Sequence, residues 1–289
     1  MFIENHHTAG VILWESRSQY NQIGNLGFPD NHMKIVIALK QVPARDSVLR
    51  VDPSANWISE DDLTFEVNEH DAYALEEGLE LKAKHGGEVV VLCAGPARAL
   101  RAIREALAKG ADRAIHVEHD GLAALDPFQV AGLLADAVRP EAPDLILTGL
   151  QSDDLGYGQT GVILAEILGY PHSTIVMGVE KIDSGIRVKR ELENGWFQHI
   201  EMALPALVTV QSGIRRLRYA TLMGIRQAKT KAIRRVTGPD AGPASGGGRI
   251  QVRRVYAPER ATHAQLFSGN PKEAAARLVE RLRREARAL

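Results

Sequence analysis

Residues 144–168 read DLILTGLQSDDLGYGQTGVILAEIL, and this stretch decides the class of fold. The apolar run Asp144–Thr148 has the composition of a buried strand, and a helix is predicted at Gln159–Leu168. The polar, glycine-rich loop Gly149–Gly161 joins the two. A strand that leads through a loop into a helix is the repeating unit of a parallel sheet with helices on its faces.

The same alternation continues on both sides of this unit, from Met33 onward. Further buried strands, rich in Val, Ile and Leu, are predicted at Lys34–Leu39, Glu88–Cys93, Ala114–Val117 and Ala206–Val210. Amphipathic helices are predicted between them at Asn68–His85, Pro96–Gly110 and Pro127–Val138. The fold class that follows is α/β, with a doubly wound and mostly parallel sheet.

The segment Ile175–Met202 has a different pattern. Gly178–Ile182 and Ile186–Glu191 are strand-like, an Asp-Ser-Gly turn joins them, and a second turn follows at Glu193–Gly195. Short turns of this kind connect antiparallel neighbours. We therefore expect an antiparallel addition at the edge of the sheet.

Four parts of the chain are expected. Residues 33–236 form the α/β domain, and residues 237–250, rich in Gly, Pro, Ala and Ser, form a flexible linker. Residues 251–289 form a C-terminal arm and helix. Residues 1–32 show little periodicity and are interpreted as a leader outside the fold, either disordered or introduced by cloning, with a degraded organelle-targeting segment as the alternative.

The C-terminal helix has a clear start signal. Asn270 is placed as its cap, Pro271 lies in the first turn and Glu273 follows three residues after the cap. One face carries an apolar stripe, which fits docking on the chain's own domain as well as docking on another chain. The stripe consists of Ala275, Leu278, Val279, Leu282 and Ala286.

Bulk properties exclude several classes of function. The 35 basic and 36 acidic residues nearly cancel, so no global field attracts nucleic acid or an anionic membrane. No apolar run reaches the roughly 18 residues of a membrane-spanning helix. The single cysteine, Cys93, excludes an internal disulfide and is typical of a reducing compartment. We expect a cytoplasmic protein that neither binds nucleic acid nor inserts into a membrane.

Three strand ends are candidates for a ligand site, because doubly wound sheets bind ligands beyond the carboxyl ends of their strands. They are Ala38–Lys40, Cys93–Pro96 and the Gly149–Gly161 loop. The loop's glycines allow close approach to a phosphate, and Gln159 and Thr160 place donors at a helix start. A long connecting loop that merely precedes a capped helix is the alternative.

Catalytic motifs are absent from the sequence. It has no Gly-x-Gly-x-x-Gly after the first strand, no P-loop, no His-Glu-x-x-His and no Gly-x-Ser-x-Gly. Asp153 and Asp154 are the nearest candidates for binding a ribose or a metal, although a solvated pair of loop acids is the commoner outcome for such a dipeptide. Residues 215–235 contain arginines and lysines but no acid, so they fit an acidic protein, phosphates or plain solvent.

Taken together, several segments resemble the beta subunit of electron-transferring flavoproteins, over about Met33–Val236. Each segment is weak alone, but their order and spacing are specific. The segments are Ala38-Leu39-Lys40, Asn68, Leu75-Glu76-Glu77, Ala94-Gly95-Pro96, Ala106 to Arg113, Gly149 to Gly161, Lys189-Arg190-Glu191, Leu204-Pro205-Ala206, Arg218 to Leu222 and Ala228-Lys229.

The resemblance implies an adenine nucleotide alpha hydrolase-like fold and a heterodimer. An alpha subunit would hold most of an FAD, and this beta chain would bind AMP, or a second FAD in bifurcating members. The implied nucleotide site combines the three strand ends. Its residues are Ala38, Asn68, Glu69, His70, Asp71, Ala94, Gly149, Gln151, Ser152, Asp154, Gly158, Gln159, Thr160 and Gly161.

A docking element for partner dehydrogenases is also implied, within residues 215–235 and with Leu222 as its anchor. Basic neighbours would attract acidic partners. The other implied docking residues are Tyr219, Ile225, Arg226 and Lys229. Arg190 and Glu191 match a family pair thought to guide the mobile flavin domain of the alpha subunit, and an ion pair at the sheet edge is the alternative.

The loop departs from both nucleotide-binding patterns of the family. Leu155–Gly158 replace the acids and Asn usual in AMP-binding members, and the loop lacks the Asp-Gly-Asp-Thr-Ala-Gln-Val-Gly of bifurcating members. Thr160 favours AMP. The expected function is electron transfer from a flavin dehydrogenase to a quinone-linked respiratory acceptor, without a catalytic residue of the chain's own. The alternatives are a bifurcating subunit that oxidises NADH and, from another class, a stand-alone ATP-binding stress-type protein or hydrolase.

Overall fold

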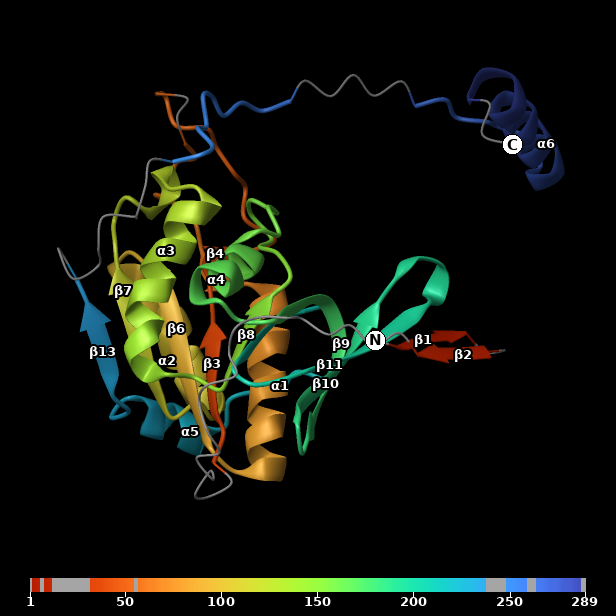
Figure 1. The fold of residues 1–289 in the computed structure, drawn as a ribbon. Helices are drawn as coiled ribbons and strands as arrows, with labels where there is room; N and C mark the ends of the chain where they lie inside the picture. The colour runs from red at the N-terminus through yellow and green to blue at the C-terminus, as the bar shows by residue number, and fades with distance from the viewer. Residues whose placement is uncertain are drawn as a thin grey trace. The chain divides into compact units, whose positions relative to one another are not determined.

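The computed structural model describes residues 2–5, 8–11, 32–54, 57–237, 248–258 and 264–286 of the chain. Eleven of the described strands form one sheet in the order β13-β7-β6-β3-β8-β12-β9-β10-β11-β1-β2 (Figure 1). A second, two-stranded sheet pairs β4 with β5. The chain divides into the unit Met1–Val255, which contains both sheets, and the unit Tyr256–Leu289.

Seven neighbouring strands, from β13 to β9, run parallel. β3 is central, and the chain passes from it to β6 and β7 on one side before it returns to β8 and β12 on the other. This reversal confirms the doubly wound fold class. The bounds are β3 Lys34–Ala38, β6 Glu88–Gly95, β7 Arg113–Glu118, β8 Leu145–Gly149, β12 Ala206–Val210, β9 His172–Ile182 and β13 Ile233–Val236.

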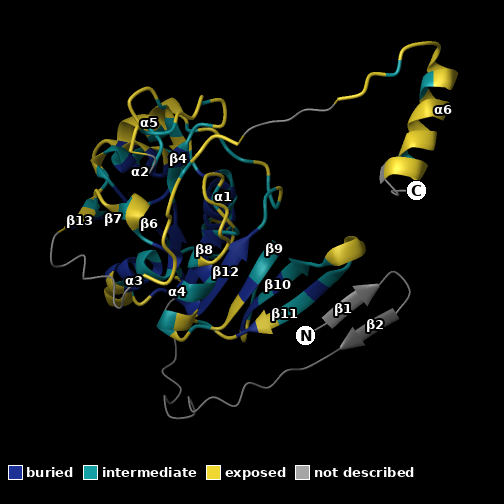
Figure 2. Ribbon diagram, turned by 90° about the horizontal axis from the view of Figure 1, so that it is seen from above, coloured by how far each residue is buried: buried dark blue, intermediate teal, exposed yellow. Residues whose placement is uncertain are grey.

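Helices cover both faces of the parallel strands, and side chains alternate between the two cores. Ile35 and Ile37 of β3 point to the core beneath α1 and α2, whereas Val36 points to the core beneath α3 and α4. Figure 2 shows these parallel strands buried between the helices. The helices are α1 Glu69–His85, α2 Leu100–Lys109, α3 Pro127–Val138 and α4 Thr160–Leu168. Each predicted helix is confirmed, although a 3₁₀ turn at Ala97–Ala99 precedes α2.

The antiparallel addition is confirmed and is larger than expected. β9 first pairs in parallel with β12 and then antiparallel with β10, Gly185–Glu191, which pairs with β11, Phe197–Met202. β1, Phe2–Asn5, pairs with β11 and with β2, Thr8–Val11. These two strands lie within residues 1–32, so the structure differs there from the expectation of a leader outside the fold; residues 12–31 lie outside the described residues.

Three other strands were not expected from the sequence. β13 extends the sheet beside β7 and uses the last residues of the basic stretch. β4, Gln41–Pro43, and β5, Phe65–Val67, close the ends of the long connection between β3 and α1. Between β12 and β13 lies one more short helix, α5 Leu222–Ala228, which packs on α2.

The second unit contains the helix α6, Pro271–Arg281, which continues as a π-helix at Leu282–Ala286. The predicted cap is confirmed, because the Asn270 side chain accepts a hydrogen bond from the Glu273 N–H at 3.0 Å. Leu278 and Val279 of the apolar stripe are exposed. Most of the expected linker, residues 238–247, lies outside the described residues. None of the described helices is both long and apolar enough to cross a membrane.

Asp126 joins the start of α3 to the last two residues of the expected linker. Its Oδ1 accepts from the Gln129 N–H at 2.9 Å in a capping box, and its Oδ2 accepts from the N–H groups of Arg249 and Ile250. Burial alone would raise the pKa of this carboxyl, but the backbone N–H donors outweigh burial and hold the pKa below its usual value. The carboxylate therefore stabilises the folded state when it is ionised.

We predict that Asp126→Ala lowers the free energy of unfolding by about 1–2 kcal/mol at pH 7, because α3 loses its cap. A lowered folded-state pKa contributes stability above the unfolded-state pKa of about 4, and that contribution is lost as the pH falls through the folded-state value. Urea denaturation at pH 7 and pH 3 measures both effects. Asp136→Ala, which removes an exposed acid from the same helix, is the control. Equal stability of the two variants at pH 7 would contradict the role of Asp126.

Candidate functional site

A cavity of about 320 Å³ lies beyond the carboxyl ends of β3, β6 and β8. β3 and β8 are neighbours whose connections leave toward opposite sides of the sheet, so the cavity lies at the topological switch point. The start of α4 borders one part of it, and the connection from β3 to α1 borders another. Its volume is near the lower end of the range for small-molecule sites.

Twelve of the fourteen expected nucleotide-site residues line this cavity, and the three strand ends therefore come together as expected. The lining residues among them are Ala38, Asn68, Asp71, Ala94, Gly149, Gln151, Ser152, Asp154, Gly158, Gln159, Thr160 and Gly161. Glu69 and His70 do not line it. The half-buried Glu69 instead pairs with Arg45, and the His70 Nδ1 atom lies 3.9 Å from Asp153 Oδ1.

An apolar wall completes the cavity and was not expected from the sequence. It comes from two connections, residues 57–65 before α1 and residues 122–130 before and within α3. The apolar side chains of this wall are Trp57, Ile58, Phe65, Leu122, Leu125 and Val130. No motif marks these loops, and the only signal is a tryptophan and a phenylalanine in the connection before α1.

Arg98 fastens one side of this wall. Its guanidinium donates to Glu60 Oε1 at 2.9 Å and to Gln41 Oε1 at 2.7 Å, and it stacks 3.8 Å from the centre of the Phe65 ring. The salt bridge to Glu60 and the cation–π contact with Phe65 together tie the connection between β3 and α1 to the segment that follows β6. Arg98 therefore fixes the position of the Phe65 ring in the cavity wall.

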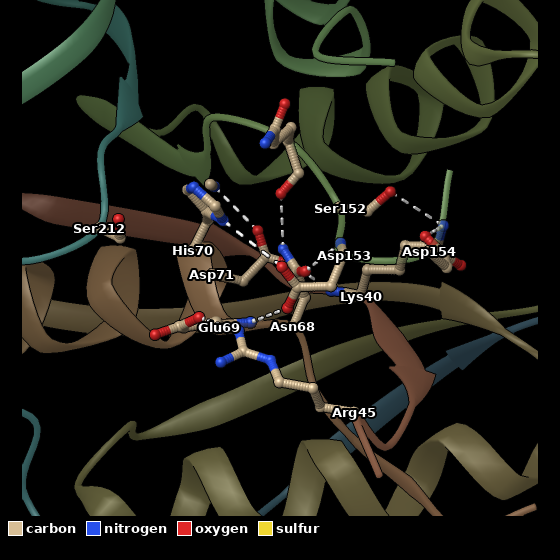
Figure 3. A network of polar contacts seen from close by, with 12 residues as sticks. Lys40, Arg45, Asn68, Glu69, His70, Asp71, Ser152, Asp153, Asp154 and Ser212 are labelled. Atoms are coloured by element: carbon tan, nitrogen blue, oxygen red, sulfur yellow. Dashed lines mark hydrogen bonds and ion pairs between the residues drawn. The ribbon is translucent and has the colours of Figure 1, made fainter. Parts of the chain in front are cut away.

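Asn68 holds the glycine-rich loop from below. The loop backbone contacts its amide on two sides, because Asn68 Nδ2 donates to the Gln151 carbonyl at 2.9 Å and Asn68 Oδ1 accepts from the Asp153 N–H at 2.9 Å (Figure 3). Asn68 is 1% exposed, so its side chain is a structural bridge with both polar atoms satisfied.

Asp71 bridges the two central strands. Its Oδ2 accepts from the Lys40 N–H at 2.7 Å and its Oδ1 accepts from the Gly149 N–H at 2.9 Å (Figure 3). Burial raises the pKa of Asp71 to about 7, although these N–H groups and Asn68 favour the carboxylate. The two N–H groups thus partly offset the effect of burial and favour the ionised form of this carboxyl group at the cavity floor.

The side chains of Asp153 and Asp154 both bind other groups of the chain. Asp153 Oδ2 accepts from the Glu69 N–H at 3.1 Å and so caps α1, while Asp154 pairs with Lys40 Nζ at 2.6 Å (Figure 3). Burial would raise the pKa of Asp154, but Lys40 outweighs it and the pKa is lowered. Among the described residues there is no group of three His, Cys, Asp or Glu side chains that could hold a metal ion.

The first turn of α4 offers uncapped backbone N–H groups to the cavity. Its cap residue, Gln159, makes no side-chain capping hydrogen bond, whereas α3, α5 and α6 all have one. Gln159, Thr160 and Gly161 line the cavity at this end. Free N–H groups and the helix dipole make such a terminus a site for an anion.

Two glycines of the loop are also required by the fold itself. Gly158 has a φ of +62°, which favours glycine. A Cβ on Gly161 would lie 2.6 Å from Thr148 Oγ1 and 2.8 Å from Thr209 Cγ2. Gly161 therefore lets α4 approach the strands closely, and Gly158 lets the loop turn back into the helix.

A second surface lies on and before α5. Leu222 is 82% exposed and Tyr219 is 92% exposed, and the neighbouring Met223 and Ile225 are also exposed. The sequence singled out all but Met223, which follows the anchor directly. Large apolar side chains that gather on a surface mark an interaction site.

The basic stretch is not the free electrostatic surface that the sequence suggested. Arg215 pairs with Glu77, Arg218 pairs with Glu76 and Glu80, and Lys231 donates to the carbonyls of Leu107 and Ala111. Arg234 and Arg235 pair with Glu141 and Glu118. Arg226 and Lys229 are exposed and have no ion pair with the described residues, so they remain the cations beside Leu222.

Arg190 and Glu191 lie at the end of β10, which pairs with β9 and with β11, and neither residue lines the cavity. Glu191 accepts from Gln211 Nε2 at 3.4 Å, and the buried Arg190 Nε has no hydrogen-bond partner among the described residues. Within the part of the chain that the structure describes, neither side chain forms the ion pair at the sheet edge that was the alternative interpretation. The pairing register of β9 and β10 shifts between Lys189 and Arg190, which re-aims this end of the strand.

Comparisons with known proteins agree with this geometry. Residues 56–241 match the model of the electron transfer flavoprotein domain. The chain is 37% identical over 257 residues to the electron transfer flavoprotein subunit beta of Methylophilus methylotrophus, which covers 86% of this chain and 97% of that protein. It is 36% identical over 213 residues to the Homo sapiens subunit beta, which covers 73% of this chain and 83% of that protein. The chain therefore belongs to the electron transfer flavoprotein beta-subunit family.

Proposed function

We propose that the chain is the beta subunit of a heterodimeric electron transfer flavoprotein that takes electrons from a flavin dehydrogenase and passes them to a quinone-linked respiratory acceptor. Its family membership already assigns it to electron transfer. An alpha subunit would complete the heterodimer and hold most of the FAD. The observation that carries the proposal is a switch-point cavity that joins an uncapped helix start to an apolar wall.

The cavity suits AMP in both shape and chemistry. The first turn of α4, with Gln159 and Thr160, would bind the phosphate, and the polar loop at Gln151 and Ser152 would face the ribose. The apolar wall would pack against the base. A cavity of about 320 Å³ favours AMP over a second FAD, which contains the AMP group and a flavin besides.

This chain's own residues would position groups rather than react. Bound FAD would supply the redox chemistry, as flavins do in proteins of many folds. Asn68 and Asp71 fix the loop and strand ends that would hold the AMP, and no proton transfer is required of them. Arg190 and Glu191 are proposed to meet the mobile flavin domain of the alpha subunit from the end of β10.

The surface around Leu222 is proposed to dock the dehydrogenase. Its exposed apolar side chains would enter a pocket of the partner, and Arg226 and Lys229 would meet acidic groups at the rim. A carrier has to dock and leave repeatedly, which suits a small apolar contact.

The cofactor proposal predicts one FAD and one AMP per heterodimer. The chain would be co-expressed with its alpha partner, the complex denatured, and the released nucleotides measured by chromatography. Two FAD per heterodimer would establish a bifurcating subunit instead. No flavin, or no complex with an alpha subunit, would overturn the proposal.

We further predict that Gln159→Ala combined with Thr160→Val lowers the AMP affinity about tenfold or more, because hydrogen bonds to a charged group contribute roughly 1.5–3 kcal/mol each. Calorimetric titration of the nucleotide-depleted complex with AMP measures the change. Gln227→Ala combined with Thr230→Val makes the same chemical changes at α5 and is the matched control. Equal affinities of the two double variants would place the phosphate elsewhere.

For the docking surface, we predict that Leu222→Ala raises the KM for the dehydrogenase about tenfold and leaves kcat within about twofold, because the lost contact is made in binding. Steady-state kinetics with a flavin dehydrogenase that reduces the wild-type complex provide the test. Leu49→Ala truncates another exposed leucine, in the loop after β4, and should leave KM unchanged. A normal KM for Leu222→Ala would rule out this docking role.

A further inference from the structure

The segment that carries Leu222 cannot hold its own shape. We call residues 219–231 the docking segment. Its only helix, α5, has seven residues, and Ala228 is the only one of these that is buried. A helix this short is unstable in water without tertiary contacts. Contacts with the rest of the domain must therefore fix the direction in which Leu222 and Met223 point.

The end of the docking segment that follows α5 is held by α2. Arg104 of α2 donates to the carbonyls of Ala228 and Lys231. In return, the Lys231 ammonium donates to the Leu107 carbonyl at 3.0 Å. A Cβ on Gly224 would lie 2.2 Å from the Ala108 carbonyl oxygen, so glycine lets α5 lie directly against α2.

The other end is held by buried acids of α1. Glu77 is fully buried and accepts from Arg215 at 2.5 and 3.2 Å. Glu76 is 5% exposed and accepts from the Arg218 side chain at 2.8 Å and from the Arg218 backbone N–H at 3.0 Å. Glu80 adds a second carboxylate to Arg218 at 3.1 Å.

These ion pairs explain why Arg215 and Arg218 lie just before the exposed apolar side chains of the docking segment. Forked arginine–carboxylate pairs restrict geometry as well as charge. Arg218 directly precedes Tyr219, so its backbone position sets where the exposed side chains begin. A segment that is ordered before it binds loses less conformational entropy when it docks. Arg215 and Arg218 would therefore serve docking without contacting a partner.

We propose that Arg215 and Arg218, paired with Glu77 and Glu76 of α1, are positioning residues that hold the docking segment in the conformation a partner dehydrogenase recognises. This inference rests on the docking role proposed above. It differs from electrostatic steering, because the charges of these arginines are neutralised inside the chain and are not offered to the partner.

Arg218→Met is the first test. Glu76 keeps the backbone N–H of residue 218, and Glu80 is only half-buried, so the variant removes the fork without leaving the buried carboxylate unpartnered. In the complete heterodimer, amide hydrogen exchange of the docking segment should become about tenfold faster. The KM for the dehydrogenase should rise about tenfold with kcat within about twofold, and Arg218→Lys should restore part of both values.

Glu77→Met combined with Arg215→Met is the second test. Removal of one partner alone would strand a buried charge and destabilise the fold, whereas joint replacement by residues of similar shape is tolerated. The double variant should increase exchange and KM in the same way, while nucleotide content stays at the wild-type level. A wild-type thermal midpoint would show that the domain remains folded.

Two controls separate anchoring from loss of charge. Arg113→Met breaks pairs with Glu88 and Glu141 and should change neither exchange of the docking segment nor KM. Arg226→Met removes a cation from the segment itself without breaking an anchor, and should leave exchange unchanged. If Arg226→Met accelerates exchange as much as Arg218→Met does, the anchoring role is wrong.

Leu222→Ala, measured alongside, distinguishes failure of this inference from failure of the proposed function. If Leu222→Ala raises KM but the anchor variants leave both exchange and KM unchanged, the positioning role is overturned and docking stands. If Leu222→Ala has no effect either, the docking function is wrong, and the positioning role falls with it. Faster exchange with an unchanged KM would also overturn the positioning role, because the order of the segment would then not matter to the partner.

Discussion

The Asp71 carboxylate is the contact on which the rest of the site depends. Neighbouring parallel strands whose connections leave in opposite directions separate at their carboxyl ends, and the N–H groups of Lys40 and Gly149 then need acceptors. One buried carboxylate serves both. A side-chain amide would present an oxygen to one of these N–H groups but an NH₂ donor to the other, which explains why a carboxyl group lies where burial raises its pKa to about 7. The Asp71 side chain thus fixes the spacing of the ends of β3 and β8, which form the floor of the cavity.

Helix α1 carries this arrangement into the second surface. Its first turn supplies Asp71. Asn68, the residue immediately before the helix, fixes the glycine-rich loop. Little more than one turn after Asp71, Glu76 and Glu77 accept hydrogen bonds from Arg218 and Arg215, which lie just before the docking segment. A single rigid element thus places both the cavity residues and the segment that displays Leu222. The acids on its buried face also explain why α1 is less amphipathic than α2.

The parallel strands and four covering helices were predictable because burial on both faces leaves continuous apolar runs such as Lys34–Ala38. Most of the cavity lining was predictable because strand ends converge at the switch point. β13, with the sequence Ile-Arg-Arg-Val, was missed because it is short and its middle residues are exposed. The apolar wall at Trp57 was missed because only the fold brings that loop to the cavity. The basic stretch was misjudged because Arg215 finds Glu77 at a separation of 138 residues, which no local pattern reveals.

These long-range pairs bear on how a carrier with a net charge near zero recognises a partner. Most cations of the basic stretch are satisfied by the chain's own acids or carbonyls, so the charge left beside Leu222 is small. On the docking role proposed above, partner choice would then depend on the shape of the exposed apolar residues and on the rigidity of the segment that carries them, rather than on a wide electrostatic field. A strong field would speed encounter, but it would attract acidic proteins without discrimination. An ordered apolar segment held by internally paired arginines would instead combine selectivity with a small contact, which a carrier could release before it reaches its acceptor.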